Sequence, residues 1–144
     1  MSLISVSILA IFTTLEESLV IEKLREIRKL RFKIKRIDEQ IEDIRGKMEH
    51  HAIIYSDLPK NPGYKDNIME MFMSRIEELE LEKSKIQLKI DMILDEISFL
   101  PEASYRVLIY KYVDEMSWEQ ISQKLGYSKS SCQRFCNNAK KISF

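Results

Sequence analysis

Apolar residues recur in alternating steps of three and four along two long stretches of this chain. In the first stretch they stand at Ile27, Leu30, Ile34, Ile37, Ile41, Ile44 and Met48, and in the second at Phe72, Ile76, Leu79, Ile86, Ile90, Ile93, Ile97 and Leu100. This is the heptad spacing of a coiled-coil seam. The breaker-rich segment SDLPKNPGYKD lies between the two stretches. We therefore predict an antiparallel coiled-coil hairpin over residues 15–100, with its loop at about residues 56–66.

Lys83 interrupts the second seam. A lysine at a seam position can fix the register of a coiled coil at a cost in stability. The interpretation that we favour is simpler: the aliphatic stem lies along the seam and the ammonium group reaches water.

The pattern changes after Pro101 to three short segments, PEASYRVLIYKYVDE, SWEQISQKL and SKSSCQRFCNNAKKI. Each carries a helix-start signal, namely Pro101 at a first helical position, the capping box of Ser117 and Gln120, and the hydroxyl cap Ser128 behind the turn at Gly126. We predict three helices over residues 101–144, and hence an all-α chain in which a long hairpin precedes a small C-terminal domain.

The last two of these helices have the spacing of a helix-turn-helix. The residues expected to meet in its core are Ile121, Leu125, Cys132 and Phe135, with the small Ser122 allowing close approach and Gly126 permitting the turn. Trp118 and Tyr127 also fall at positions between helices, so we assign them to the core and not to stacking on single-stranded nucleic acid.

Charge is balanced overall but not along the chain. With 23 basic and 23 acidic residues the net charge is zero, which excludes a uniformly basic nucleic-acid coat. From residue 128 to the end, however, the sequence has four cations and no acid. We predict that the last helix presents a DNA-binding face made of Ser128, Lys129, Ser130, Gln133, Arg134, Asn137, Lys140 and Lys141.

These residue types suit the reading of a major groove. Arg134 can fork onto guanine, Gln133 and Asn137 can pair with adenine, and the lysines and the helix start at Ser128 suit phosphates. The alternative interpretation is an ordinary solvated polar face.

A second basic run lies in the first arm. Lys23, Arg25, Arg28, Lys29, Arg31, Lys33, Lys35 and Arg36 are accompanied only by Glu26, whereas the second arm carries Glu70, Glu77, Glu78, Glu80, Glu82, Asp91, Asp95 and Glu96. Contact of stretch 23–36 with DNA or an acidic partner is one interpretation. We favour pairing between the two arms, because charge runs on helices usually flank a seam.

The first fourteen residues are apolar but resemble neither a signal peptide nor a membrane anchor. No Lys or Arg precedes the apolar run, and the run is too short to span a bilayer. We expect residues 1–14 to be a strand-like or helical extension that packs on the arm, or else a mis-assigned start. No membrane association is predicted.

The remaining candidate chemistry is sparse. Cys132 and Cys136 lie four apart on one predicted helix, which suits neither a disulfide framework nor a metal site without further ligands, and His50 and His51 lie on the distant arm. No catalytic triad, phosphate-binding glycine loop or cofactor motif can be assembled. We therefore predict a cytoplasmic protein, not an enzyme, with no metal or cofactor.

The segment YRVLIYKYVDEMSWEQISQKLGYSKSSCQRFCNNAKK resembles the C-terminal part of small phage and prophage proteins related to the ArpU and RinA late-gene regulators. The tails of those proteins are similar to the promoter-recognising fourth region of bacterial sigma factors. The likeness is carried by Arg106-Val107-Leu108, Tyr112-Val113, Ser117-Trp118-Glu119-Gln120-Ile121 and Leu125-Gly126-Tyr127-Ser128, and extends more weakly through IRGKMEHHAIIYSDLPKNP and the second arm. Cys132 and Phe135 replace the aliphatic residues usual there.

Two functional hypotheses follow. The resemblance implies a sequence-specific transcription regulator of phage genes in a bacterial host cell, with double-stranded DNA as partner, RNA polymerase as a further candidate partner, and a homodimer formed through the arm as one option. The alternative is a coiled-coil adapter, terminase-like or polymerase-binding, whose tail docks protein.

Overall fold

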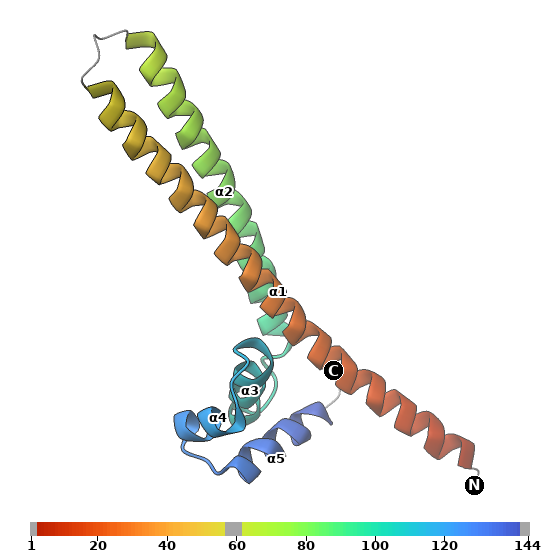
Figure 1. Ribbon diagram of the computed structural model, residues 1–144. Helices are drawn as coiled ribbons and strands as arrows, with labels where there is room; N and C mark the ends of the chain where they lie inside the picture. The colour runs from red at the N-terminus through yellow and green to blue at the C-terminus, as the bar shows by residue number, and fades with distance from the viewer. Residues whose placement is uncertain (1–2, 57–61, 142–144) are drawn as a thin grey trace. The chain divides into compact units, whose positions relative to one another are not determined.

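The computed structural model describes residues 3–56 and 62–141, and side chains in 19–54 and 67–141. Figure 1 shows its elements, which are α1 (Leu3–Ser56), α2 (Pro62–Glu96), α3 (Glu102–Leu108), the π-helix η1 (Ile109–Val113), α4 (Trp118–Leu125) and α5 (Lys129–Lys140). Every regular element of these ranges is helical, so the predicted all-α class is confirmed. None of the helices in the described part is long and apolar enough to cross a bilayer.

Chain contacts divide the molecule into two compact units. One consists of Met1–Lys29 together with Ile90–Phe144, and the other is Leu30–Lys89. The base of the long helices thus belongs to the same unit as the short C-terminal helices. The rest of the hairpin, Leu30–Lys89, forms a unit of its own.

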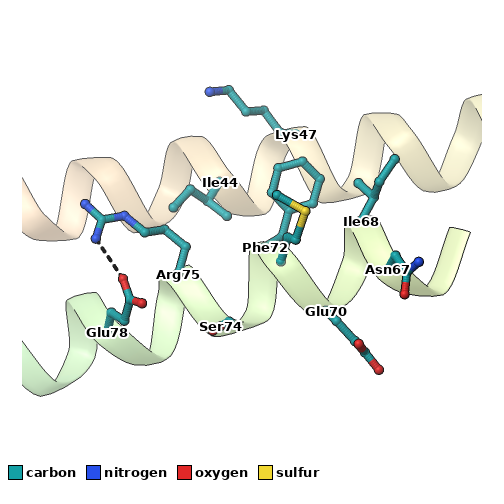
Figure 2. A pocket seen from close by; sticks show the side chains of 10 residues that line it. Ile44, Lys47, Asn67, Ile68, Glu70, Phe72, Ser74, Arg75 and Glu78 are labelled. Carbon is teal, nitrogen blue, oxygen red and sulfur yellow. Dashed lines mark hydrogen bonds and ion pairs between the residues drawn. The ribbon is translucent and has the colours of Figure 1, made fainter. Parts of the chain in front are cut away.

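In the unit Leu30–Lys89, α1 and α2 run antiparallel along the predicted seam (Figure 1). Leu30, Ile37, Ile41, Leu79 and Ile86 are buried, whereas Ile34, Ile44, Met48, Phe72 and Ile76 are partly exposed. Near the hairpin end Phe72 and Ile44 lie between the two helices, and Arg75 of α2 reaches toward α1 and pairs with Glu78 at 3.0 Å (Figure 2). The seam is therefore best covered away from the hairpin end.

The loop is shorter than predicted. Helix α2 begins at Pro62, inside the predicted loop of residues 56–66, while residues 57–61 lie outside the described part. Proline is well suited to a first helical turn, because its missing N–H has no partner there in any case. The cluster of prolines and glycine therefore includes the start of a helix as well as residues of the predicted loop.

Lys83 does not simply extend to water. Its Nζ lies 2.6 Å from Oδ1 of Asp38 on the opposite helix, and the lysine side chain is 35% exposed. The hydrogen bond to Asp38 is the main reason why the pKa of Lys83 is raised. The stem occupies the seam as expected, but the ammonium group makes a cross-helix ion pair, which also fits the register-fixing interpretation.

In the other unit, the core joins residues far apart in the sequence. Its buried residues come from three parts of the chain. They are Val20, Leu24 and Ile27 of α1; Ile90, Ile93, Ile97 and Leu100 at the end of the second arm; and Val107, Leu108, Val113, Ile121, Cys132, Cys136 and Ala139 of the short helices. Among them Leu24, Leu108 and Ile121 are fully inaccessible. The short helices thus share their unit with the base of the arm.

The first predicted tail helix differs from expectation at both ends. Pro101 is the residue before helix α3, which starts at Glu102, and the segment continues as a π-helix from Ile109 to Val113. The chain then leaves the helix through Glu115, whose φ of 54° is unusual for a residue with a side chain. The Glu115 carboxylate pairs with Arg28 of α1 at 2.5 Å, in the same unit.

The predicted start and stop signals around α4 and α5 are confirmed. Ser117 and Gln120 form a reciprocal capping box, with distances from backbone nitrogen to side-chain oxygen of 3.0 and 3.2 Å. Gly126 adopts φ 78°, the left-handed conformation that favours glycine, and Ser128 caps α5 by accepting a hydrogen bond from the Ser131 N–H. The helix-turn-helix connection is thus fixed by local chemistry.

Residues from Leu3 onward continue α1 without a break, so of the two forms expected for the N-terminal extension the helical one is observed. Its predicted packing on the arm lies outside the described side chains.

Candidate nucleic-acid interface

Helix α5 has one buried and one exposed face. Cys132, Cys136 and Ala139 lie in the core, whereas Gln133 and Asn137 are exposed. This division follows from helical spacing, because residues three and four apart share a face. Among the described residues, neither amide side chain makes a hydrogen bond, so both keep their donors and acceptors available.

Arg134 lies on the same exposed face. Its guanidinium carbon is 5.8 Å from the centre of the neighbouring Phe135 ring, and it forms no ion pair with any described carboxylate. Phe135 itself is half-buried and meets the edge of the Tyr127 ring at 5.2 Å. The guanidinium of Arg134 therefore lies beside an aromatic ring, and its five N–H donors stay available for a ligand.

The remaining predicted interface residues are distributed unevenly. Ser128, Ser130 and Lys141 are exposed, and Lys140 is partly covered, with its Nζ 5.3 Å from the centre of the Tyr112 ring. All eight predicted residues are thus on or beside α5, but Lys140 is engaged with the π-helix. Its charge contributes to holding α5 as well as to any surface potential.

Lys129 is paired within the protein. Its Nζ lies 2.6 Å from Oε1 of Glu119 on α4, and the hydrogen bond and charge of this lysine hold the pKa of Glu119 below its usual value. Both side chains are more than half exposed, so the pair is open to exchange with an external anion. Helix α5 carries no carboxylate of its own, as the sequence indicates, but Glu119 of α4 brings a negative charge to its first turn.

Cations stacked on aromatic rings brace the short helices. Lys111 lies 4.8 Å from the centre of the Trp118 ring, and Lys124 lies 5.0 Å from that of Tyr110. These contacts link the π-helix to α4 and keep Trp118 half-buried. The sequence predicts that Trp118 packs between helices, and its half-buried position agrees with that prediction.

The prediction of a core position for Tyr127 is wrong. The side chain is 45% exposed, because the left-handed turn at Gly126 directs the following residue outward. The Ser122 hydroxyl donates a hydrogen bond to the Tyr127 carbonyl and fixes this turn. Tyr127 is thus a surface aromatic beside α5 that helical periodicity could not reveal, since the residue lies outside both helices.

Both cysteines are free thiols in the core of the short helices. Burial raises the pKa of both Cys132 and Cys136, and at Cys136 a hydrogen bond with Tyr112 and nearby lysines partly offset this effect. No group of three or more potential metal ligands occurs in the part of the chain that the structure describes.

We expect these thiols to react slowly with a disulfide reagent in the folded protein. The thiolate is the reactive form, and both burial and the raised pKa reduce its supply. At pH 8 labelling should be slower than in urea-unfolded protein, and it should accelerate as the pH rises. Stopped-flow absorbance with Ellman's reagent measures this, and equal rates in folded and unfolded protein would show that α5 is not docked.

Comparison with known proteins adds no relative: no family model, curated protein or solved structure matches the chain. Function therefore has to be inferred from the residues themselves. What they form is a capped helix, braced on one side by its neighbours and presenting arginine and two amides on the other.

Proposed function

We propose that the protein is a sequence-specific DNA-binding transcription regulator of phage type, similar to the fourth region of sigma factors, in which α5 enters the major groove. The observation that carries the proposal is the exposed, unpaired set of Gln133, Arg134 and Asn137 on one helix face. Those three side chains can form two-point hydrogen bonds with purine edges. The cap at Ser128 leaves further N–H groups of the helix start for phosphate.

Lys129, Lys140 and Lys141 would supply phosphate contacts around this face. Lys129 can do so by exchanging the Glu119 carboxylate for a phosphate, since its pair is exposed and therefore weak. RNA polymerase and a second copy of the chain are the partners that such a regulator would use, and a bacterial host cytoplasm is its expected location.

The test is a gel shift with sequences selected by the purified protein from a random duplex pool. We expect Arg134→Ala and Gln133→Ala each to weaken binding to the selected sequence by about 1–3 kcal/mol, because each change removes a two-point base contact. Binding to unrelated duplex should change less, since base contacts are absent there.

Matched controls are Arg106→Ala on α3, whose guanidinium pairs with Glu102, and Gln123→Ala on α4; both side chains are exposed. They should leave selected-sequence binding within about 0.5 kcal/mol of the parent, as surface substitutions usually do. If no sequence is enriched, or if the α5 variants bind like the controls, the proposal fails.

A second candidate is an interaction protein that uses the hairpin as its binding surface. It is favoured by large apolar side chains that are exposed on α1 and α2, among them Ile53, Met71 and Leu88. This candidate predicts no measurable affinity for duplex DNA in the same gel shift. One experiment thus separates the two.

A further inference from the structure

The middle of α1 carries an unusual density of positive charge. In the segment IRKLRFKIKRI, residues 27–37, six of the residues are Lys or Arg and none is Asp or Glu. Lys33, Lys35 and Arg36 belong to the unit Leu30–Lys89 and are all exposed. We refer to these three residues as the cationic face.

The protein does not neutralise the cationic face. The pairing between basic and acidic arms that the sequence favours is found at Lys23, which pairs with Glu96. Within the described residues, however, none of the three cations of the face forms an ion pair. The nearest following acid, Asp38, is occupied by Lys83.

Unneutralised like charges on a helix repel one another. Lys33 and Arg36 are three residues apart and therefore neighbours on the helix surface. An external polyanion would relieve this repulsion and gain entropy by releasing its own counterions. The face therefore has the electrostatic character of a phosphate-binding surface.

A second copy of the chain is a poorer occupant than a polyanion. Exposed acids such as Glu77 and Glu82 on α2 have the complementary charge. Ion pairs across such a contact would be solvent-exposed and individually weak, whereas a nucleic acid would also release its condensed counterions.

We propose that the cationic face binds the phosphate backbone of double-stranded DNA independently of its sequence. This inference rests on the proposed function, because it assumes that the protein works on duplex DNA. It gives a role to those positive charges of α1 that do not pair with acids of the second arm.

The experiment measures binding of the full chain to a random-sequence 30-bp duplex as a function of salt. Each phosphate contact contributes about 0.9 to the slope of log K against log salt. Lys33 and Lys35 are two residues apart and point to different sides of the helix, so they do not both reach one backbone. The triple variant Lys33→Gln, Lys35→Gln, Arg36→Gln should therefore lower the magnitude of the slope by roughly 1–2. Selected and random sequences should show the same reduction, since backbone contacts carry no sequence information.

A matched triple variant controls for net charge. Lys47→Gln, Lys85→Gln, Lys89→Gln removes three exposed cations from the same unit but from other positions, and its slope should stay close to that of the parent. Equal slopes for both triple variants would overturn the inference. Circular dichroism should show equal helicity and thermal melting for the compared proteins.

Phe32 separates phosphate binding from protein binding. It is 61% exposed beside the cationic face, and a duplex backbone offers its ring no apolar surface. Phe32→Ala should leave the salt slope unchanged, and a loss as large as that of the triple variant would overturn the inference in favour of another partner. If the α5 variants lose sequence preference but the triple variant keeps its slope, the proposed function survives and this inference fails. If the triple variant loses slope but the α5 variants keep their sequence preference, this inference survives and base reading by α5 is rejected.

Discussion

Shortening Ile121 to alanine is expected to lower the free energy of unfolding of the unit that contains the short helices by about 2–5 kcal/mol. Ile121 is fully inaccessible and is the buried residue of α4. Removal of its side chain loses apolar burial and leaves a cavity that the capped helices cannot easily close. Since domains are stable by only about 5–15 kcal/mol, this is a large fraction of the total.

Trp118 provides the measurement. It is the single tryptophan of the chain and begins α4, so its fluorescence reports on the short helices and not on the hairpin. Urea titration should show an earlier transition for Ile121→Ala, while the exposed neighbour Gln123→Ala should shift it by no more than about 0.5 kcal/mol. Equal midpoints for the two variants would mean that α4 is not packed as described.

The second large effect is expected at Leu24, far from Trp118 in the sequence. Leu24→Ala should also move the Trp118 transition by about 2–5 kcal/mol. The reason is that Leu24 is fully buried and belongs to the same compact unit as the short helices. A core that is shared in this way unfolds cooperatively.

Arg25 supplies the control, because it is the adjacent residue of α1 and is exposed. Arg25→Ala should leave the fluorescence transition within about 0.5 kcal/mol of the parent. A Leu24→Ala protein in which only far-ultraviolet circular dichroism changes, with an unaltered Trp118 transition, would show that the base of α1 folds independently of the short helices.

Heptad spacing and capping chemistry were sufficient to predict most of the helices. The seam from Leu30 to Ile41, the capping box at Ser117 and the cap at Ser128 are local patterns, and such patterns leave their signature in neighbouring residues. The start of α2 at Pro62 was harder to predict, because proline indicates either a loop or a first helical turn. Only the surrounding chain decides between them.

The exposed face of α5 could be located from its periodicity, whereas its electrostatic surroundings could not. Glu119 reaches Lys129 across the turn, and the sequence gives no distance between two side chains on different helices. The same holds for Arg28 and Glu115, which are far apart along the chain. The exposure of Tyr127 depended on the left-handed residue before it, which a count of helical steps ignores. Whether these side chains bind DNA stays a prediction.

The π-helix at Ile109–Val113 accommodates one extra residue between α3 and the chain that follows it. Such a segment behaves as an α-helix with one residue inserted, so deleting one residue would let it close with ordinary i to i+4 bonds. Because the wide turn takes up the extra residue, the deletion would leave the direction of the downstream chain relative to α3 nearly unchanged. It would instead disturb contacts made inside the segment, such as those of Tyr112 with Cys136 and Lys140. A one-residue deletion here would therefore loosen the seat of α5 while leaving total helicity almost the same.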